Sequence, residues 1–185
     1  MEKIILGIDP GTTVLGYGLI KVSGKQMSLI TLGVINLTKF KDHYLKLQKI
    51  YSRLHGLIEE FCPDEMALEA PFYGKNVQSM LKLGRAQGVA MAAGLMHEIP
   101  ITEYAPRKIK VALTGTGTAS KEQVASMLAK LLDTDEKPEF LDATDALAVA
   151  VCHYYQISNP IFSQVGGGAH SWKDFIQKNP SRVKK

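Results

Sequence analysis

The sequence predicts an α/β fold with one mixed five-stranded sheet, made of a three-strand antiparallel meander plus two parallel strands, and helices on both faces. Three apolar runs rich in β-branched residues follow one another at 3–9, 16–22 and 27–36, and only short turns separate them, which is typical of a meander. After residue 41 the apolar spacing becomes helical, and two further strands then alternate with helices. Such alternation favours parallel strands, because the intervening helix returns the chain to the same end of the sheet.

Caps and prolines mark the ends of the later elements. Pro63 ends the first helix, Asn76 can cap the second, and Ser120 with Gln123 matches a capping box at the start of another. The predicted elements are helices over 41–61, 76–97, a short stretch from Pro106, 120–132 and 142–156, and strands over 65–70 and 99–104.

Composition divides the chain into a domain, residues 1–158, and a flexible basic tail, residues 159–185. The domain holds equal numbers of acidic and basic side chains, whereas the tail holds five Lys or Arg and one acidic residue, so the net charge of +4 lies in the tail. Gly166-Gly167-Gly168 and a scarcity of apolar residues make the tail typical of a disordered segment. The 185 residues suit one domain and are too few for two nucleotide-binding lobes.

The sequence also predicts the compartment. The N-terminus lacks a signal-peptide pattern, and the longest uncharged apolar stretch, Gly88 to Met96, is too short to span a bilayer. Cys62 and Cys152 lie in apolar helical patterns, which favours buried free thiols. We therefore expect a cytoplasmic protein with no membrane partner.

Four carboxylates stand out because of their positions. Asp9 and Glu69 lie at the ends of predicted strands, where ligand sites of such sheets cluster, and Asp142 and Asp145 share one face of the last helix. Each also has a structural explanation: Asp9 as a turn residue, Glu69 as a solvent-facing acid, and the aspartate pair as a helix cap and a first-turn charge.

Together, the four acids predict a metal site. Convergent carboxylates repel one another unless a hard divalent cation such as Mg²⁺ or Mn²⁺ lies between them, because these ions prefer oxygen ligands. Two ions about 4 Å apart can hydrolyse a phosphodiester bond, one by activating water and the other by stabilising the leaving oxygen.

Four segments, in their order and spacing, resemble the RuvC-type Holliday junction resolvases: GIDPGTTVLGYGLI, LEAPFYGKNVQSMLKLGRAQGVA, YAPRKIKVALTGTGTASKEQV and DATDALAVAVCH. The resemblance covers about residues 1–156. It implies a ribonuclease H-like fold and a homodimer that makes paired nicks in four-way DNA junctions during recombination and repair. It also implies two Mg²⁺ ions per active site, with Mn²⁺ as a substitute, and the RuvA–RuvB branch-migration complex as a partner.

The resemblance implies roles for single residues. Its catalytic, metal-binding acids correspond to Asp9, Glu69, Asp142 and Asp145. The residues expected to contact DNA are Phe72, Tyr73, Lys75, Lys110 and Lys121. Of these, Lys121 is also expected to be catalytic. Phe72 matches an aromatic wedge at the crossover, and its position in a predicted loop suits stacking on unpaired bases. The structural alternatives are a core aromatic for Phe72 and solvated surface charges for the lysines.

Helix 76–97 carries Gly84, Gly88 and Ala92 at intervals of four, which leaves one face nearly bare and permits close helix packing. Packing inside the monomer explains this spacing as well as an interface does, and the resemblance favours a dimer interface.

Two other functions fit parts of the sequence. An ATPase or sugar-kinase lobe shares the GIDPGTT strand and turn, but the chain leaves no room for a second lobe, and TGTGTASK lacks the glycine that precedes the lysine of a P-loop. A catalytically inactive nucleic-acid-binding or scaffold domain of the same fold would have no need of all four carboxylates.

Overall fold

The computed structural model describes residues 2–71, 76–133 and 141–158. One five-stranded sheet has the strand order β3-β2-β1-β4-β5. Its strands are β1 (Glu2–Asp9), β2 (Val14–Ser23), β3 (Gln26–Asn36), β4 (Glu65–Glu69) and β5 (Ile101–Tyr104). β1, β2 and β3 pair antiparallel, whereas β4 pairs parallel with β1 and β5 parallel with β4, which confirms the predicted mixed sheet.

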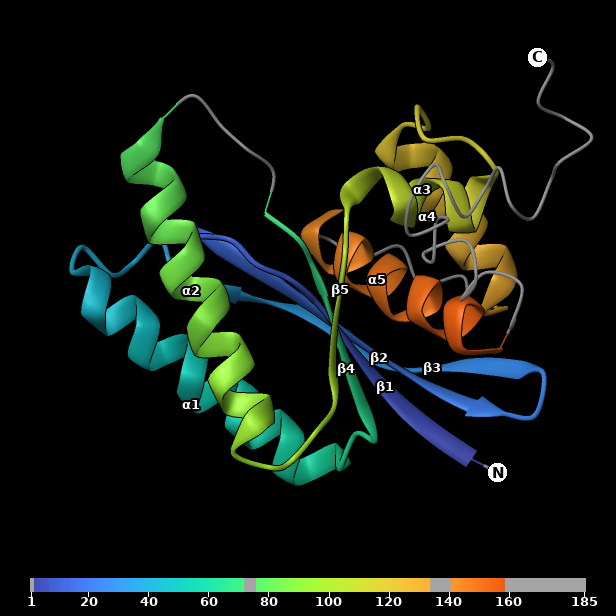
Figure 1. The fold of residues 1–185 in the computed structure, drawn as a ribbon, viewed down its shortest axis with the longest axis horizontal. Coiled ribbons are helices and arrows are strands. Elements are labelled where there is room, and N and C mark those ends of the chain that lie inside the picture. Colours follow the sequence, from blue (N-terminus) through green and yellow to red (C-terminus); the bar gives the residue numbers. More distant parts are fainter. Residues whose placement is uncertain (1, 72–75, 134–140, 159–185) are drawn as a thin grey trace, which may run out of the picture. The chain divides into compact units, whose positions relative to one another are not determined.

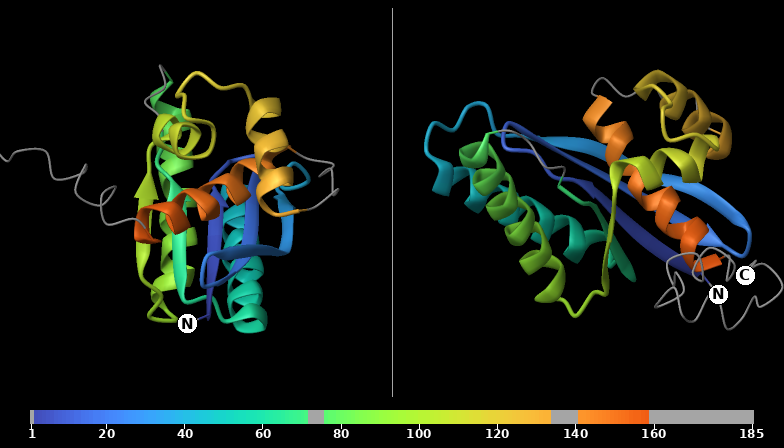
Figure 2. Two further views of the ribbon diagram at one scale, coloured as in Figure 1. Left: turned by 90° about the vertical axis from the view of Figure 1, so that its right-hand side faces the viewer. Right: turned by 45° about the horizontal axis from the view of Figure 1, so that its top comes forward.

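Helices cover both faces of this sheet, as predicted. They are α1 (His43–Phe61), α2 (Val77–Leu95), α3 (Pro106–Thr114), α4 (Lys121–Leu131) and α5 (Leu141–Ser158). Figure 1 shows α1 and α2 on one side of the sheet and α3, α4 and α5 on the other, and the turned views of Figure 2 agree. None of the described helices is long and apolar enough to cross a membrane.

The chain forms two compact units, residues 1–154 and 155–185. The first contains the sheet, and of the second only the last residues of α5 are described. The predicted tail, residues 159–185, lies outside the described residues, so the boundary after residue 158 remains a prediction.

The sheet has a central strand that is buried on both faces. Leu6 and Ile8 of β1 are fully buried in the core that the sheet shares with α1 and α2, which also contains Leu54 and Ala90. Burial on both faces accounts for the continuous apolar run of this strand, in place of the alternating pattern of a half-exposed one. A rigid central strand therefore carries Asp9 at its end.

The predicted caps are present. The side chain of Asn76 accepts a hydrogen bond from the Ser79 amide at 3.1 Å, and Ser120 and Gln123 form the capping box at the start of α4. The prediction of two buried thiols is right for Cys152 and wrong for Cys62, which is exposed. Cys62 follows the last residue of α1 in the left-handed conformation, so it has left the buried face of the helix.

Candidate active site

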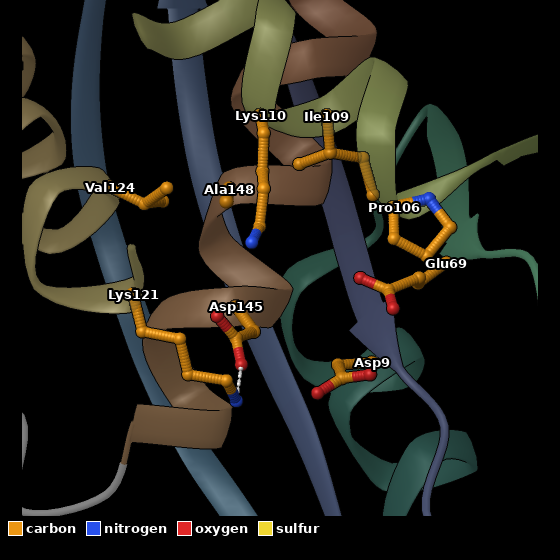
Figure 3. Close-up of a pocket in the computed structure, with 9 residues that line it drawn as sticks. All are labelled: Asp9, Glu69, Pro106, Ile109, Lys110, Lys121, Val124, Asp145 and Ala148. Atoms are coloured by element: carbon orange, nitrogen blue, oxygen red, sulfur yellow. Dashed lines mark hydrogen bonds and ion pairs between the residues drawn. The ribbon is translucent and has the colours of Figure 1, made fainter. Parts of the chain in front are cut away.

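Two carboxylates leave the sheet at the same edge. Asp9 is the last residue of β1 and Glu69 the last of β4, and the two strands run parallel with Ile8 opposite Leu68. The carboxyl ends of parallel neighbours meet at one edge, so both acids end up side by side. Both are half-buried, and Figure 3 shows their carboxylates pointing into one pocket.

Helix α5 brings two more acids to this edge. Asp142 lies in its first turn and Asp145 follows three residues later. One carboxylate oxygen each from Asp9, Asp142 and Asp145 lie within 4.8 Å of one another, and Glu69 faces the same pocket as Asp9 and Asp145. The alternative explanation of Asp142 as a helix cap does not hold, because α5 begins at Leu141 and Asp142 lies in its first turn.

Glycines in β1 and β2 allow α5 to approach the sheet this closely. A Cβ atom at Gly16 would lie 2.0 Å from the carbonyl oxygen of Asp142, and one at Gly18 would lie 2.9 Å from the Cα of Leu147. Gly16 is the cross-strand partner of Asp9, so the bare backbone lies beside the acid that the helix must reach. The sequence reasoning missed this role, although glycines inside a strand signal a close backbone approach.

The pocket at this edge has a volume of about 370 Å³, and its walls differ in charge and polarity. Asp9, Glu69 and Asp145 form the acidic side, and Lys110 of α3 and Lys121 of α4 face them across the pocket (Figure 3). The remaining wall is mostly apolar and was not predicted; it consists of Pro106, Ile109, Val124 and Ala148. Apolar walls limit the water around the charges, which strengthens every electrostatic interaction in the pocket.

Lys121 contacts the acids directly. Its Nζ donates a hydrogen bond to Oδ2 of Asp145 and lies 3.9 Å from Oδ1 of Asp142. Lys110 lines the same pocket and is half-buried. The other residues predicted to bind DNA, Phe72, Tyr73 and Lys75, lie outside the described residues.

A second cleft of about 190 Å³ opens beside the first and shares Asp9 and Glu69 with it. On its far side lie Leu83 and Gln87 of α2, and the Gln87 side chain donates a hydrogen bond to Glu103 of β5. Gln87 was not predicted as a site residue. Gln87 is a polar residue among small and apolar residues of α2, and this position in the sequence could have marked it as a candidate.

Burial and mutual repulsion make the strand-end acids reluctant to ionise. Burial, and then the charges of Glu69, Asp145 and Asp142, raise the pKa of Asp9 from 3.8 to about 8. Burial and the charge of Asp145 raise the pKa of Glu69 from 4.5 to about 7. A cluster of carboxylate oxygens of this kind fits a hard divalent cation, because the cation removes the repulsion among the acids that Lys121 offsets only in part.

These raised pKa values predict how stability depends on pH in the metal-free protein. In the unfolded chain Asp9 ionises near pH 4, whereas in the folded protein it keeps its proton up to about pH 8. Between these values the folded state holds more protons, so the free energy of unfolding should fall as pH rises. Urea denaturation in EDTA at pH 5 and pH 8 measures this, and Asp9→Asn should flatten the dependence. An equally steep fall in Asp9→Asn would contradict the assignment to Asp9.

Fold and site together define a class. A meander followed by two parallel strands, with carboxylates at the ends of β1 and β4 and on the covering helix α5, is the arrangement of the ribonuclease H-like proteins. More narrowly, residues 5–153 match the family model of the crossover junction endodeoxyribonuclease RuvC, and the chain belongs to this family.

Individual relatives agree with this assignment. The chain is 60% identical over 185 residues to the crossover junction endodeoxyribonuclease RuvC of Bacteroides fragilis, a match that covers 99% of this chain and 97% of the relative. The solved structure of Thermus thermophilus RuvC is 31% identical, with a TM-score of 0.76, and the match covers 84% of this chain and 95% of that one. The same Thermus protein in complex with a Holliday junction substrate is 28% identical in the match, with the same TM-score and coverage.

Proposed function

We propose that this protein resolves four-way DNA junctions by hydrolysing phosphodiester bonds with two Mg²⁺ ions held by Asp9, Glu69, Asp142 and Asp145, and that Mn²⁺ can substitute. The observation that carries the proposal is the convergence of carboxylate oxygens from β1 and α5 within 4.8 Å in a pocket that two lysines face. Bound there, the ions would supply an activated water and stabilise the leaving oxygen.

The side chains around the acids have complementary tasks in this proposal. Lys110 and Lys121 bind the phosphates next to the scissile bond, where their charge also offsets the charge that develops during hydrolysis. The apolar wall formed by Ile109 and Val124 keeps bulk water away from the reacting phosphate.

A cleavage assay on a synthetic four-way junction tests the proposal. Nicks should appear at symmetric positions in two strands when Mg²⁺ is added, and none should appear in EDTA. Junction binding without nicking in Mg²⁺ and in Mn²⁺ would favour the alternative, a catalytically inactive nucleic-acid-binding or scaffold domain. Nucleotide hydrolysis without nicking would favour the ATPase or sugar-kinase alternative.

We also propose that the protein acts as a homodimer through one face of α2. Gly84, Gly88 and Ala92 are exposed there, and a Cβ atom at either glycine would meet nothing within 4 Å among the described residues. Leu81 and Leu95 extend the same face and are 52% and 62% exposed. Packing against the described residues therefore does not account for the small residues, whereas a two-fold dimer would bury them and bring two active sites to one junction.

The dimer predicts the effect of a bulky residue at Gly88. Gly88→Leu should separate the two helices and weaken dimerisation by about five- to a hundred-fold, because overpacking at a close helix contact costs roughly 1–3 kcal/mol. Analytical ultracentrifugation measures the dissociation constant. Gly88→Ala, which adds a single methyl group, is the matched control and should change it less. A wild-type protein that sediments as a monomer and still makes paired cuts would rule out this role of α2.

Phe72 should separate junction handling from bond cleavage. Base–aromatic stacking contributes roughly 1–3 kcal/mol per base, so Phe72→Ala should cut intact junctions about ten- to a hundred-fold more slowly. The variant should recover on junctions whose bases are already unpaired near the cut, since no carboxylate has changed. The two substrates are compared at one salt concentration because phosphate contacts depend on salt. Equal loss on both substrates would assign Phe72 a packing role.

Three further expectations belong to the same proposal. The RuvA–RuvB branch-migration complex would deliver the junction, the process would be DNA recombination and repair, and the compartment would be the cytoplasm. They rest on membership of the family and on the sequence. Co-purification of RuvA and RuvB with junction-bound protein tests the first of them.

A further inference from the structure

Lys121 holds the position of a counter-ion in the acidic cluster. Its Nζ donates to Oδ2 of Asp145 and lies within ion-pair distance of Oδ1 of Asp142, and both aspartates belong to the set whose oxygens converge. Figure 3 shows the Lys121 side chain reaching from α4 to Asp145. Among the described residues, no other lysine or arginine forms an ion pair with these acids.

The backbone that carries Lys121 is fixed, while its side chain can move. The capping box of Ser120 and Gln123 sets the start of α4 at this residue, so the position of its Cα is defined. The side chain is 50% exposed, and the four-carbon stem of a lysine is flexible. A positive charge in the first turn also opposes the helix dipole, so α4 itself gains nothing from the lysine.

The ammonium and a divalent ion compete for the same charges. An ammonium bonded to Asp145 neutralises part of the negative charge that would attract the ion, and it repels any cation that the converging oxygens hold. Each cation therefore weakens the binding of the other. When a resident group occupies a site, the ligand binds only to the molecules in which the group has left. The apparent affinity is therefore reduced to that fraction of its intrinsic value.

We propose that Lys121 is the resident counter-ion of the cluster, that it is displaced when a divalent ion binds, and that its ammonium then becomes available to a DNA phosphate. This inference rests on the proposed metal-dependent function. It gives Lys121 two successive partners: Asp145 in the metal-free protein, and the phosphate in the loaded one. The metal-free cluster is thereby stabilised by the same charge that later holds the substrate.

Mn²⁺ binding to the DNA-free, full-length protein tests the exchange, with the dissociation constant measured by electron paramagnetic resonance. Lys121→Gln removes the competing charge and should bind Mn²⁺ about tenfold more tightly than the wild type. Lys121→Arg keeps the charge and should stay close to the wild-type value. Lys110→Gln is the matched control, because it removes a positive charge from the same pocket, and the ion pairs of Asp142 and Asp145 in the described part of the chain involve Lys121 instead.

A second readout separates metal binding from turnover. Lys121→Gln should bind Mn²⁺ more tightly and yet nick junctions more slowly, because the lysine that contacts the phosphate is gone. Unchanged or weaker Mn²⁺ binding in Lys121→Gln would overturn the exchange and leave the proposed function standing. An equal gain in Mn²⁺ affinity in Lys110→Gln would also overturn the exchange. The gain would then come from the loss of any positive charge in the pocket, and not from the ion pair of Lys121. If neither the wild type nor any variant bound Mn²⁺, both the exchange and the metal-dependent function would be refuted.

Discussion

Replacing Asp9 with asparagine is expected to lower the rate of Mg²⁺-dependent nicking on the order of a thousand-fold or more. The substitution keeps the shape of the side chain and removes a carboxylate whose oxygen lies within 4.8 Å of oxygens of Asp142 and Asp145 and which shares its pocket with Glu69. Loss of a metal ligand takes several kcal/mol from the stabilisation of the transition state, and about 4 kcal/mol corresponds to three decades in rate. Single-turnover nicking of a synthetic junction measures the effect.

Junction binding should survive in the same variant. Lys110 and Lys121 remain in place, and phosphate contacts of this kind supply much of the affinity for DNA. The dissociation constant in Ca²⁺ or EDTA should therefore stay within about threefold of the wild-type value. Full nicking activity of Asp9→Asn at ordinary Mg²⁺ concentrations would refute the assignment of the active site, and equal losses of binding and nicking would indicate a misfolded variant.

The second large effect is expected at Gly16, a residue that has no reactive side chain. An added Cβ in Gly16→Ala would lie 2.0 Å from the carbonyl oxygen of Asp142, so the first turn of α5 must move away from β2. Overpacking of this kind costs roughly 1–3 kcal/mol, and a contact with backbone belongs at the upper end of that range. Since 1 kcal/mol corresponds to about 2–4 °C in a domain of this size, the melting temperature should fall by about 5–10 °C.

The displacement should also reduce catalysis in the protein that remains folded. Asp142 and Asp145 move with the helix while Asp9 stays on β1, and a misplacement of about 1 Å can cost about a hundred-fold in rate. Nicking is therefore measured at 20 °C, well below the melting temperature of the variant, and Mn²⁺ affinity is measured alongside. A normal rate with a lowered melting temperature would show that α5 moves without disturbing the carboxylates.

Gly56→Ala provides the matched control for this substitution. Gly56 lies inside α1, and a Cβ atom there meets nothing within 4 Å among the described residues. Alanine in a helix interior is more favourable than glycine by roughly 0.5–1 kcal/mol, so this variant should be slightly more stable than the wild type. Nicking should be unchanged, because α1 contributes no residue to the pocket.

Local signals in the sequence determined the elements and the identity of the candidate acids. Residues a few positions apart determine the meander, the parallel strands and the caps at Asn76 and Ser120. Capping hydrogen bonds and side-chain periodicity act between such near neighbours, so they can be recognised in the sequence. Asp9 and Glu69 could be selected for the same reason, since a strand end is itself a local feature. Asp142 and Asp145 were selected because they share one helix face, although local patterns explain them equally well as helix-terminal charges, and the family resemblance then favoured the metal-binding role for all four acids.

Only the tertiary structure decided what these residues meet. The contact between α5 and Gly16, the raised pKa of Asp9 and the ion pair of Lys121 with Asp145 each join segments far apart in the chain. The open face of α2 is likewise visible only when all neighbouring elements are in place. Burial, electrostatic repulsion and steric contact depend on distances through space, and a single sequence records only distances along the chain.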